Sequence, residues 1–249
     1  MLTPERHERI LETVKNNQTA SIKQLVDVTQ ASESTIRRDL DELERQGHLR
    51  RVHGGASIKQ SAADEPAMKD KQTKLQEEKR AIASYAASFV KDGDSIFVDA
   101  GSTTYEMIPF LKQKDIIVVT NGLDHLLALT DHGIRTYVLG GLVKSRTGAV
   151  VGAGALQNLK QYRFDNCFMG VNGITLEDGF TTPDPEEAAI KQRTLQLSRE
   201  RFILADHTKF GETSFTQFAD IHEADIITND NGTTYMDYAE KTNIKVVTT

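Results

Sequence analysis

The sequence lacks most of the features that would place it in a membrane or outside the cell. It has one cysteine, Cys167, which excludes an intramolecular disulfide and is typical of a small core residue in a reducing compartment. No apolar run approaches the roughly 18 residues that would suggest a membrane span. The opening MLTPERHERILETV has no apolar segment of the signal-peptide type. We therefore expect a cytoplasmic protein with no membrane partner.

The composition is ordinary for a globular protein, but the charge is unevenly distributed. Hydrophobic residues make up 38% and charged residues 27% of 249 residues, a length with room for two domains. Residues 1–60 hold 10 basic and 9 acidic residues, whereas the rest holds 20 basic and 27 acidic residues. This difference in sign is typical of a DNA-binding module joined to an acidic body. It is small, so the position of the cations on a motif matters more.

Three helical patterns open the chain. The first covers about residues 4–16, with a proline in its first turn. SIKQ, which begins at Ser21, is a capping-box pattern for a short second helix. Ser32 caps a third helix, SESTIRRDLDELERQ, and Gly47 ends it. LRRVHGGASI then predicts a β wing with a Gly-Gly turn, so residues 1–57 are predicted to form a winged helix-turn-helix.

The third helix carries polar groups on the side away from its apolar stripe. Ser34 and Thr35 lie in its first turn, where the helix dipole favours a phosphate. Arg37 and Arg38 follow as long donors for phosphates or guanine edges. An arginine pair alone is more often a solvated charge, but the whole arrangement favours DNA binding. With two residues from the wing, the predicted DNA-binding residues are Ser34, Thr35, Arg37, Arg38, Arg51 and His53.

The remainder of the chain predicts a linker and an α/β domain. Residues 58–75 are polar, contain Pro66 and lack a sustained apolar period, which indicates a linker. Residues 76–249 alternate between helix and strand, and the strands are continuous Val/Ile/Phe runs. Repeated strand-to-helix connections predict a mostly parallel sheet. The predicted fold class is therefore α/β, with a winged helix-turn-helix in front.

The segment SIFVDA-GSTT-YEMI predicts an anion site. Gly101, Ser102, Thr103 and Thr104 lie where a loop opens a helix, which offers free N–H groups, hydroxyls and the helix dipole. Such turns also use Gly and Thr merely for capping. Ligands of open α/β sheets bind outside the carboxyl ends of the strands, so polar residues at other strand ends should converge there. These residues are Asp99, Asn121, Gly141, Gly170, Asn172 and Asp206.

The segment GFTTPDPEEAAIK is the second informative stretch of the predicted domain. Pro183 and Pro185 make a stiff loop that leads into a helix, on which Glu187 and Lys191 lie four residues apart on one face. Taken alone, the pair favours an exposed helix ion pair. The alternative is a cation beside the anion site, and both residues are included among the predicted ligand-binding residues. Lys209, in ADHTKFG, is a further candidate cation that we expect to be peripheral.

Several segments along nearly the whole chain resemble a known family. SIKQLVDVTQASESTIRRDLDELERQGHLRRVHGGA is similar to the N-terminal signature of the DeoR family of bacterial sugar-metabolism regulators, with STIRRDL and RVHGGA the most specific parts. VDAGSTT, TNGL, VLGG, FMGVNGI, GFTTPDPEEAAIK and ADHTKFG resemble the sensor domain of that family, which in turn resembles ribose-5-phosphate isomerase. The linker departs from the family pattern, because PAMKDKQTK lacks the expected aromatic residue and arginine.

The resemblance implies a transcription regulator with two partners. The winged helix would bind double-stranded operator DNA, and the sensor domain would bind a phosphorylated sugar that relieves repression. GFTTPDPEEA looks closest to regulators of fructose and lactose/tagatose phosphotransferase operons, so fructose 1-phosphate is the first expectation and tagatose 6-phosphate the second. Two-fold half-sites require at least a dimer, so we expect a homodimer or homotetramer. No cofactor or metal is expected.

A sugar-phosphate isomerase that carries a DNA-binding head is the competing class. Isomerisation needs a general base and an acid beside the substrate. The isomerases have paired carboxylates after the strand that matches FMGVNG, whereas residues 171–173 here are Val-Asn-Gly. A regulator that acts through protein contacts alone would leave the arginine pair unexplained. We expect binding without turnover, although three carboxylates remain as possible bases: Asp99, Glu187 and Asp206.

Overall fold

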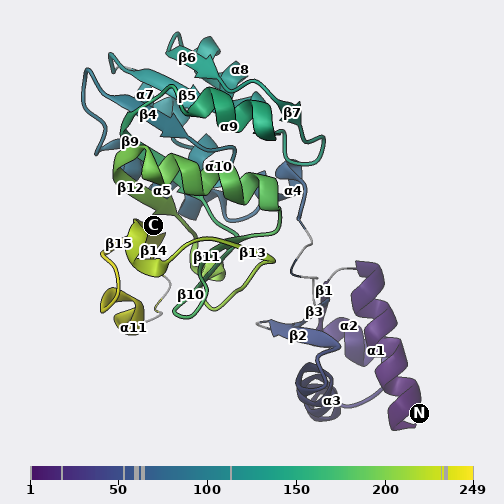
Figure 1. Ribbon diagram of the computed structural model, residues 1–249. Helices are drawn as coiled ribbons and strands as arrows, with labels where there is room; N and C mark the ends of the chain where they lie inside the picture. The colour runs from purple at the N-terminus through teal and green to yellow at the C-terminus, as the bar shows by residue number, and fades with distance from the viewer. Residues whose placement is uncertain are drawn as a thin grey trace. The chain divides into compact units, whose positions relative to one another are not determined.

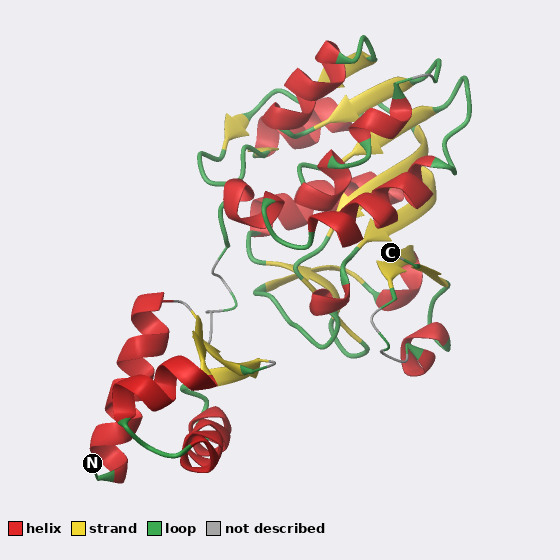
Figure 2. Ribbon diagram, turned by 180° about the vertical axis from the view of Figure 1, so that it is seen from behind, coloured by secondary structure: helices red, strands yellow, loops and turns green. Residues whose placement is uncertain are grey.

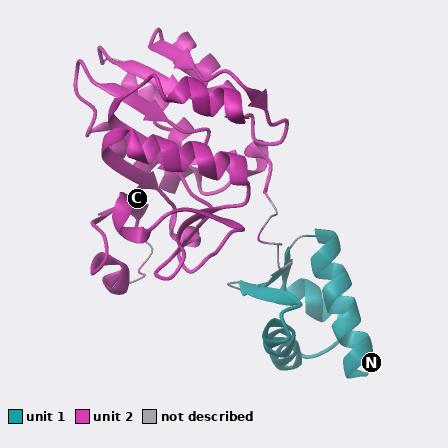
Figure 3. Ribbon diagram, in the orientation of Figure 1, with its two compact units in different colours: residues 1–61 teal, residues 62–249 magenta. Residues whose placement is uncertain are grey.

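The chain forms two compact units, residues 1–61 and residues 62–249 (Figure 3). The boundary falls inside the predicted linker. No helix in the described part of the chain is long and apolar enough to cross a membrane. The computed structural model describes residues 2–17, 19–52, 54–58, 62, 65–112, 114–230, 232 and 235–248.

The first unit is a winged helix-turn-helix, as the sequence predicts. Its elements are α1 (Thr3–Asn17), β1 (Thr19–Ser21), α2 (Ile22–Thr29), α3 (Glu33–Arg45), β2 (Leu49–Val52) and β3 (Gly55–Ile58). β2 and β3 form the antiparallel wing, and β1 pairs with the other side of β3. The three-residue strand β1 was not predicted, because only one of its side chains, that of Ala20, is buried. The apolar faces of all three helices and β2 share one core.

The helix ends of this unit form through the predicted caps. The Ser21 hydroxyl accepts from the Gln24 N–H at 3.2 Å, and the Gln24 side chain accepts from the Ser21 N–H at 2.8 Å. Ser32 caps α3, where its hydroxyl accepts from the Thr35 N–H at 3.3 Å. Gly47, with φ of 76°, follows the last turn of α3 in the left-handed conformation. These local contacts set the bounds of α2 and α3 independently of the core.

Two adjacent glycines are needed in the wing for different reasons. Gly54 has φ of 80°, a conformation that L side chains rarely adopt. A Cβ atom at Gly55 would lie 2.1 Å from the carbonyl oxygen of Ala20, so only glycine lets β3 pair closely with β1. The HGG run therefore has a structural basis in its glycines, whereas His53 lies outside the described residues.

A seven-stranded parallel sheet forms the centre of the second unit (Figure 1). Its strands are β4 (Ser95–Val98), β5 (Ile117–Thr120), β6 (Arg135–Val138), β9 (Phe164–Gly170), β12 (Ser198–Leu204), β14 (Asp225–Asn229) and β15 (Ile244–Val247). The strand order is β15-β14-β12-β9-β4-β5-β6. Neighbouring side chains of one strand enter opposite cores: Phe97 packs on one face, and Ile96 and Val98 pack on the other. This two-sided burial explains the continuous apolar runs.

Helices cover both faces of this sheet (Figure 2). One face packs against α5, α7 and α8, and the other packs against α9 and α10. The helices of the unit are α4 (Met68–Gln72), α5 (Gln76–Ala87), α6 (Ser102–Tyr105), α7 (Ile108–Leu111), α8 (Leu123–Asp131), α9 (Ala153–Leu159), α10 (Pro185–Gln196) and α11 (Met236–Ala239). Short 3-10 turns cover His207–Lys209 and Ile221–Glu223. The parallel α/β architecture agrees with the prediction.

Several local features of the second unit differ from the prediction. The strand-loop-helix pattern predicts one helix up to Leu111, whereas residues 102–111 form two short helices, because Pro109 has no N–H to continue the first one. The sequence predicts a helix over about residues 185–200, whereas α10 ends at Gln196, since β12 starts at Ser198. Five short strands were not foreseen: β7 (Leu142–Val143) and β8 (Val150–Val151) form a hairpin, and β10 (Gly173–Thr175), β11 (Gly179–Thr182) and β13 (Thr216–Ala219) form an antiparallel sheet.

The order of the strands defines where the chain changes direction across the sheet. From β4 the chain adds β5 and β6 on one side, then returns to place β9 on the other side of β4. The register pairs Val98 with Phe168, so the carboxyl ends of β4 and β9 lie together. Open α/β sheets bind ligands at such a switch point. The residues that follow these two strands are therefore the candidates for a ligand-binding site.

Candidate functional site: a DNA-binding helix and a sheet-edge anion site

Helix α3 presents the predicted DNA-binding residues at the surface of the first unit. Ser34, Arg37 and Arg38 are exposed and Thr35 is half-buried. The Arg37 guanidinium pairs with Glu33 on the same helix at 2.6 Å, but both side chains are more than half exposed, and such pairs contribute little. Arg38 has no ion pair within the described residues. Both arginines are thus accessible to a phosphate or a base edge.

Arg51 of the wing has a structural partner as well. Its guanidinium pairs with Asp41 of α3, and its backbone N–H donates to the Glu44 carboxylate at 2.6 Å. These contacts attach the wing to α3. Arg51 keeps partial exposure, so it lies beside the exposed arginines of α3 rather than on an isolated hairpin. Its predicted companion in the wing, His53, is outside the described residues.

Asp39, in the middle of STIRRDL, does not belong to an acidic exposed face. It is buried, and its carboxylate accepts from the Arg6 guanidinium at 2.5 and 3.0 Å and contacts His7 Nε2 at 3.1 Å. Burial alone would raise the pKa of the Asp39 carboxyl, but the hydrogen bonds from Arg6 and His7 hold it below its ordinary value. Asp39 therefore fastens α3 to α1, which leaves the two preceding arginines facing outward.

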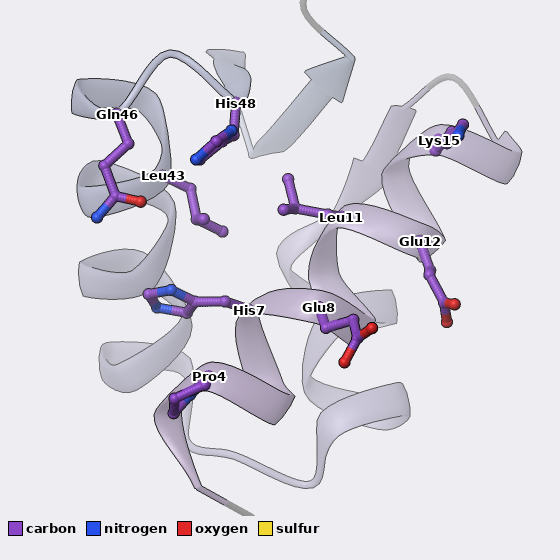
Figure 4. A pocket seen from close by; sticks show the side chains of 9 residues that line it. All are labelled: Pro4, His7, Glu8, Leu11, Glu12, Lys15, Leu43, Gln46 and His48. Carbon is purple, nitrogen blue, oxygen red and sulfur yellow. The ribbon is translucent and has the colours of Figure 1, made fainter.

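A shallow hollow of about 530 Å³ lies between α1 and the end of α3 (Figure 4). Leu11 and Leu43 point toward one another across it. His7, Lys15, Gln46 and His48 are among its polar lining residues. It shares no residue with the predicted DNA-binding set, and we assign it no part in the site.

Three predicted residues meet at the switch point of the parallel sheet. Lys191 of α10 forms an ion pair with Asp99, which follows β4, and donates to the carbonyl oxygen of Gly170 at 2.9 Å. The Gly170 N–H donates to the same Asp99 carboxylate at 3.1 Å. Asp99 and Lys191 are each only 4% exposed. The pair joins α10 to the ends of β4 and β9, and it neutralises the lysine that was expected to meet a phosphate.

The GSTT loop lies directly beside this ion pair. A Cβ atom on Gly101 would come within 3.4 Å of the Gly170 Cα, so the loop and the end of β9 are in contact. Thr104 is used inside the loop, where its hydroxyl accepts from the Gly101 N–H at 3.0 Å. The hydroxyls of Ser102 and Thr103 have no hydrogen-bond partner among the described residues. With the N–H groups of this first turn, they are the groups available to an anion.

Two residues from the next strand and helix position this loop. The Asn121 side chain, at the end of β5, accepts from the Ala100 N–H at 3.0 Å. His125 of α8 is buried, and its Nε2 atom lies 3.1 Å from the Gly101 oxygen and 3.2 Å from the Thr104 hydroxyl. Burial lowers the pKa of His125 to about 4, so the imidazole is neutral near pH 7. Sequence patterns gave no sign of His125, which reads as one polar residue on an ordinary helix.

The other predicted strand-end residues, Asn172, Asp206 and Gly141, follow different strands and have different partners. Asn172 follows β9 and accepts from the Thr182 hydroxyl at 3.2 Å. Asp206 follows β12, the neighbour of β9, and caps the next turn by accepting from the Thr208 N–H at 3.0 Å. Gly141 is elsewhere, because its nearest neighbours are Val150, Val151 and Ala155 around β8 and α9. Gly141 therefore lies away from the switch point.

Glu187 and Lys191 do not form the exposed helix ion pair that their spacing favours. Both are buried, and each has its own partner. The Glu187 carboxylate meets the Lys144 ammonium at 2.7 Å and accepts from the Thr147 hydroxyl at 3.0 Å. Burial, together with the nearby Glu65 carboxylate, raises the pKa of Glu187 above its ordinary value. The exposed-pair interpretation is therefore wrong, since α10 packs its charged face inward.

Three lysines gather on the side of the sheet edge where α4 and α5 pack against α6. Lys79 is buried and donates to the carbonyl oxygen of Lys71. Burial lowers the pKa of Lys79; Lys71 and Lys209 lie close enough to lower it further, and Asp206 opposes them. Lys71 falls in the predicted linker, and Lys79 has the pattern of an exposed helix residue. Sequence reasoning therefore missed both and placed Lys209 at the periphery.

The three carboxylates that the sequence offers as possible bases are all engaged. Asp99 accepts from Lys191 and from a backbone N–H, Asp206 caps a turn, and Glu187 is held by Lys144. Within the described ranges, no group of three His, Cys, Asp or Glu side chains is placed to hold a metal ion. The open groups are hydroxyls, N–H donors and ammonium groups. This arrangement is suited to binding an anion.

Comparison with protein families gives two matches that together cover most of the chain. Residues 6–62 match the DeoR-like helix-turn-helix domain, and residues 74–231 match the DeoR C terminal sensor domain. The first match contains the winged helix, and the second contains the sheet edge with Asp99, Lys191 and the GSTT loop.

Full-length relatives match over nearly the whole chain. A Bacillus subtilis (strain 168) protein named as the uncharacterized HTH-type transcriptional regulator FruR is 50% identical over 249 residues, with 99% of each chain covered. The lactose phosphotransferase system repressor of Lactococcus lactis subsp. lactis is 38% identical over 231 residues, covering 91% of this chain and 90% of its own. A solved ribose 5-phosphate isomerase of Methanocaldococcus jannaschii is 16% identical, with a TM-score of 0.41 and 54% of each chain covered.

Proposed function

The chain belongs to the DeoR family of transcriptional regulators, and we propose that it represses a sugar-utilisation operon in the cytoplasm until a phosphorylated sugar binds. The names of its relatives support the sugar class, since one is called FruR and others are lactose phosphotransferase system repressors. Fructose 1-phosphate is the first candidate effector and tagatose 6-phosphate the second. The effector releases the operator DNA in this proposal.

We assign DNA binding to the first unit. Arg37 and Arg38 are exposed on α3, beside the wing that Arg51 fastens to the same helix. Exposed guanidinium groups on a recognition helix suit phosphates and guanine edges. A single winged helix reads one half-site, so the proposal includes a homodimer or homotetramer on two-fold operator DNA.

One observation carries the sensing half of the proposal. The side chains of Ser102 and Thr103 are largely buried in the first turn of α6, within the GSTT segment, but their hydroxyls reach solvent and have no partner among the described residues. A hydroxyl that is held at the start of a helix and still reaches solvent can donate to a phosphate oxygen. The ammonium groups of Lys79 and Lys209 add positive charge to the same edge.

We propose further that the chain binds its sugar phosphate without converting it. An aldose–ketose isomerisation needs a carboxylate free to take a proton from the substrate carbon. Asp99 is neutralised by Lys191, and Asn172 stands where an isomerase needs a base. The alternative, an isomerase-like enzyme with a DNA-binding head, predicts turnover of pentose or hexose phosphates by the purified protein.

Fluorescence anisotropy with a labelled duplex from the chain's own upstream region tests the proposal. We expect operator binding that weakens when fructose 1-phosphate or tagatose 6-phosphate is added, with no effect of inorganic phosphate at equal concentration. The Ser102→Ala/Thr103→Val variant should bind the operator as tightly as the wild type and lose the response. Operator binding that ignores a panel of sugar phosphates would refute the sensing role, and isomerisation of the same compounds would favour the enzyme.

A further inference from the structure

Glu65 is an unusual residue for the segment that follows the first unit. Its side chain is buried, and its carboxylate pairs with Lys144 at 2.9 Å and with Lys71 at 3.2 Å. A buried carboxylate is costly unless it is paired in this way. The polar composition of residues 58–75 predicts a solvated linker, in which a buried and paired carboxylate is not expected.

Lys144 is the centre of this contact network. It lies between β7 and β8 and pairs with Asp184 at 2.8 Å and Glu187 at 2.7 Å, in addition to Glu65. Burial alone would lower the pKa of Lys144, but its hydrogen bonds to these three carboxylates raise it above its ordinary value. We call Glu65, Lys144 and Glu187 the clasp. It fastens three segments that are distant in sequence.

Helix α10 joins the clasp to the sheet edge. Glu187 and Lys191 lie one turn apart on this helix, the first in the clasp and the second paired with Asp99 beside the GSTT loop. On the other side, the segment that carries Glu65 is tied down by Met68, whose N–H donates to the Arg146 carbonyl at 3.1 Å. A shift of α10 relative to the sheet edge would therefore pull on the residues that follow the first unit.

The clasp brings like charges close together. Lys144 is shared by three carboxylates, those of Glu65, Asp184 and Glu187, and Glu65 contributes to the raised pKa of Glu187. Like charges that share a partner repel one another, so a small displacement of Lys144 or of α10 changes which carboxylate keeps it. Packed cores respond to such shifts by switching between discrete arrangements.

We propose that the clasp couples the sheet-edge site to the DNA-binding unit: effector binding beside Lys191 moves α10, Lys144 releases Glu65, and the segment from residue 65 to 72 becomes free. This inference rests on the proposed function, because it names the route by which the bound sugar phosphate changes operator affinity. The clasp contributes to coupling and not to binding itself. Coupling of this kind is a free energy shared by both sites.

The test compares coupling in four proteins: wild type, Glu65→Gln, Lys144→Met and Lys245→Met. The last is the matched control, because it removes another lysine ion pair of the same unit, with Asp225, outside the clasp. Operator Kd is measured with and without fructose 1-phosphate or tagatose 6-phosphate, and sugar-phosphate Kd with and without operator. Coupling is the ratio of operator Kd with and without sugar phosphate, and equally the ratio of sugar-phosphate Kd with and without operator. We expect both clasp variants to reduce these two ratios by at least about threefold, within the usual range of coupling, and Lys245→Met to leave them unchanged.

Hydrogen exchange of the Met68 N–H provides a second readout that needs no effector. Because this group donates to the Arg146 carbonyl beside the clasp, Glu65→Gln should speed its exchange at least about tenfold, whereas Lys245→Met should not. A Glu65→Gln protein with wild-type ratios, or with unchanged Met68 exchange, overturns the clasp. A wild type that binds operator but responds to no sugar phosphate instead removes the proposed function on which the clasp rests.

Discussion

Asp99 and Lys191 lie 92 residues apart in sequence and form a buried ion pair where β4 and β9 end. The lysine also holds the Gly170 carbonyl, so one side chain closes the point at which the chain changes direction across the sheet. The GSTT loop contacts the same backbone. The pair therefore builds the floor of the site, and this role precedes any contact with a ligand.

Removing Lys191 should destabilise the second unit. Lys191→Met leaves the Asp99 carboxylate buried without its cation, so we expect the free energy of unfolding to fall by about 3–5 kcal/mol. Asp99→Asn together with Lys191→Met should recover part of this loss, since no unpaired charge remains. Urea unfolding measures both. Arg199→Met, which removes an exposed pair with Asp165, is the control and should cost no more than about 1 kcal/mol. If Lys191→Met and Arg199→Met lose the same free energy of unfolding, the buried-pair role is contradicted.

Arg38 should be needed for operator binding. Its side chain is exposed on α3 and has no ion pair among the described residues. Arg38→Ala should weaken operator binding at least about tenfold, the cost of losing one base or phosphate contact, and leave sugar-phosphate affinity unchanged. Arg45→Ala, in the last turn of the same helix, is the control, because Arg45 pairs with Glu42 there. Anisotropy titrations that rank the two variants equally would argue against α3 as the reading helix.

Asp39 should stabilise the first unit in a pH-dependent way. Its folded pKa lies below its ordinary value, so its contribution is complete above about pH 4 and is lost as the pH falls through the folded pKa. Asp39→Asn should lower the melting temperature of the first unit at pH 7 and flatten its acid dependence. Circular dichroism melts between pH 2 and pH 7 measure both effects. The exposed Asp41 provides the control variant Asp41→Asn, which should retain the acid dependence.

His125 should make the second unit less stable in mild acid. Its pKa is about 4 when folded and about 6.5 in an unfolded chain, so the unfolded state binds more protons between these values. Stability is then complete above pH 6.5 and falls by about 3 kcal/mol as the pH drops to 4. His125→Gln should remove this slope, whereas the exposed His222→Gln should keep it. Urea unfolding at several pH values tests the prediction, and a slope that survives in His125→Gln would contradict it.

Much of the fold could be predicted from short-range sequence patterns. The caps at Ser21 and Ser32, the turn at Gly47 and the continuous apolar strands are short-range patterns, and each formed as predicted. The short strands were missed because their pairing is not local. β1 exists because the wing lies beside it, and the antiparallel sheet β10-β11-β13 joins segments separated by the whole of α10 and β12.

The candidate site likewise has features that the sequence predicts and features that it does not. The GSTT loop and the strand ends could be located because a parallel sheet brings carboxyl ends to one edge. The partners of the charged side chains could not be located: spacing favoured an exposed Glu187–Lys191 pair, and no local pattern links Asp39 to Arg6. Lys71, Lys79 and His125 carried no pattern at all, since their importance comes from burial against elements that are distant in sequence.

The sequence by itself determined the two kinds of domain, the winged helix, the parallel α/β order and the position of the GSTT loop, because periodicity, caps and motifs are written in neighbouring residues. Only the tertiary structure decided which charges meet. Burial removes the water that would otherwise screen every ion, so a carboxylate such as Asp99 or Glu65 takes the cation that packing places beside it, whatever its distance along the chain.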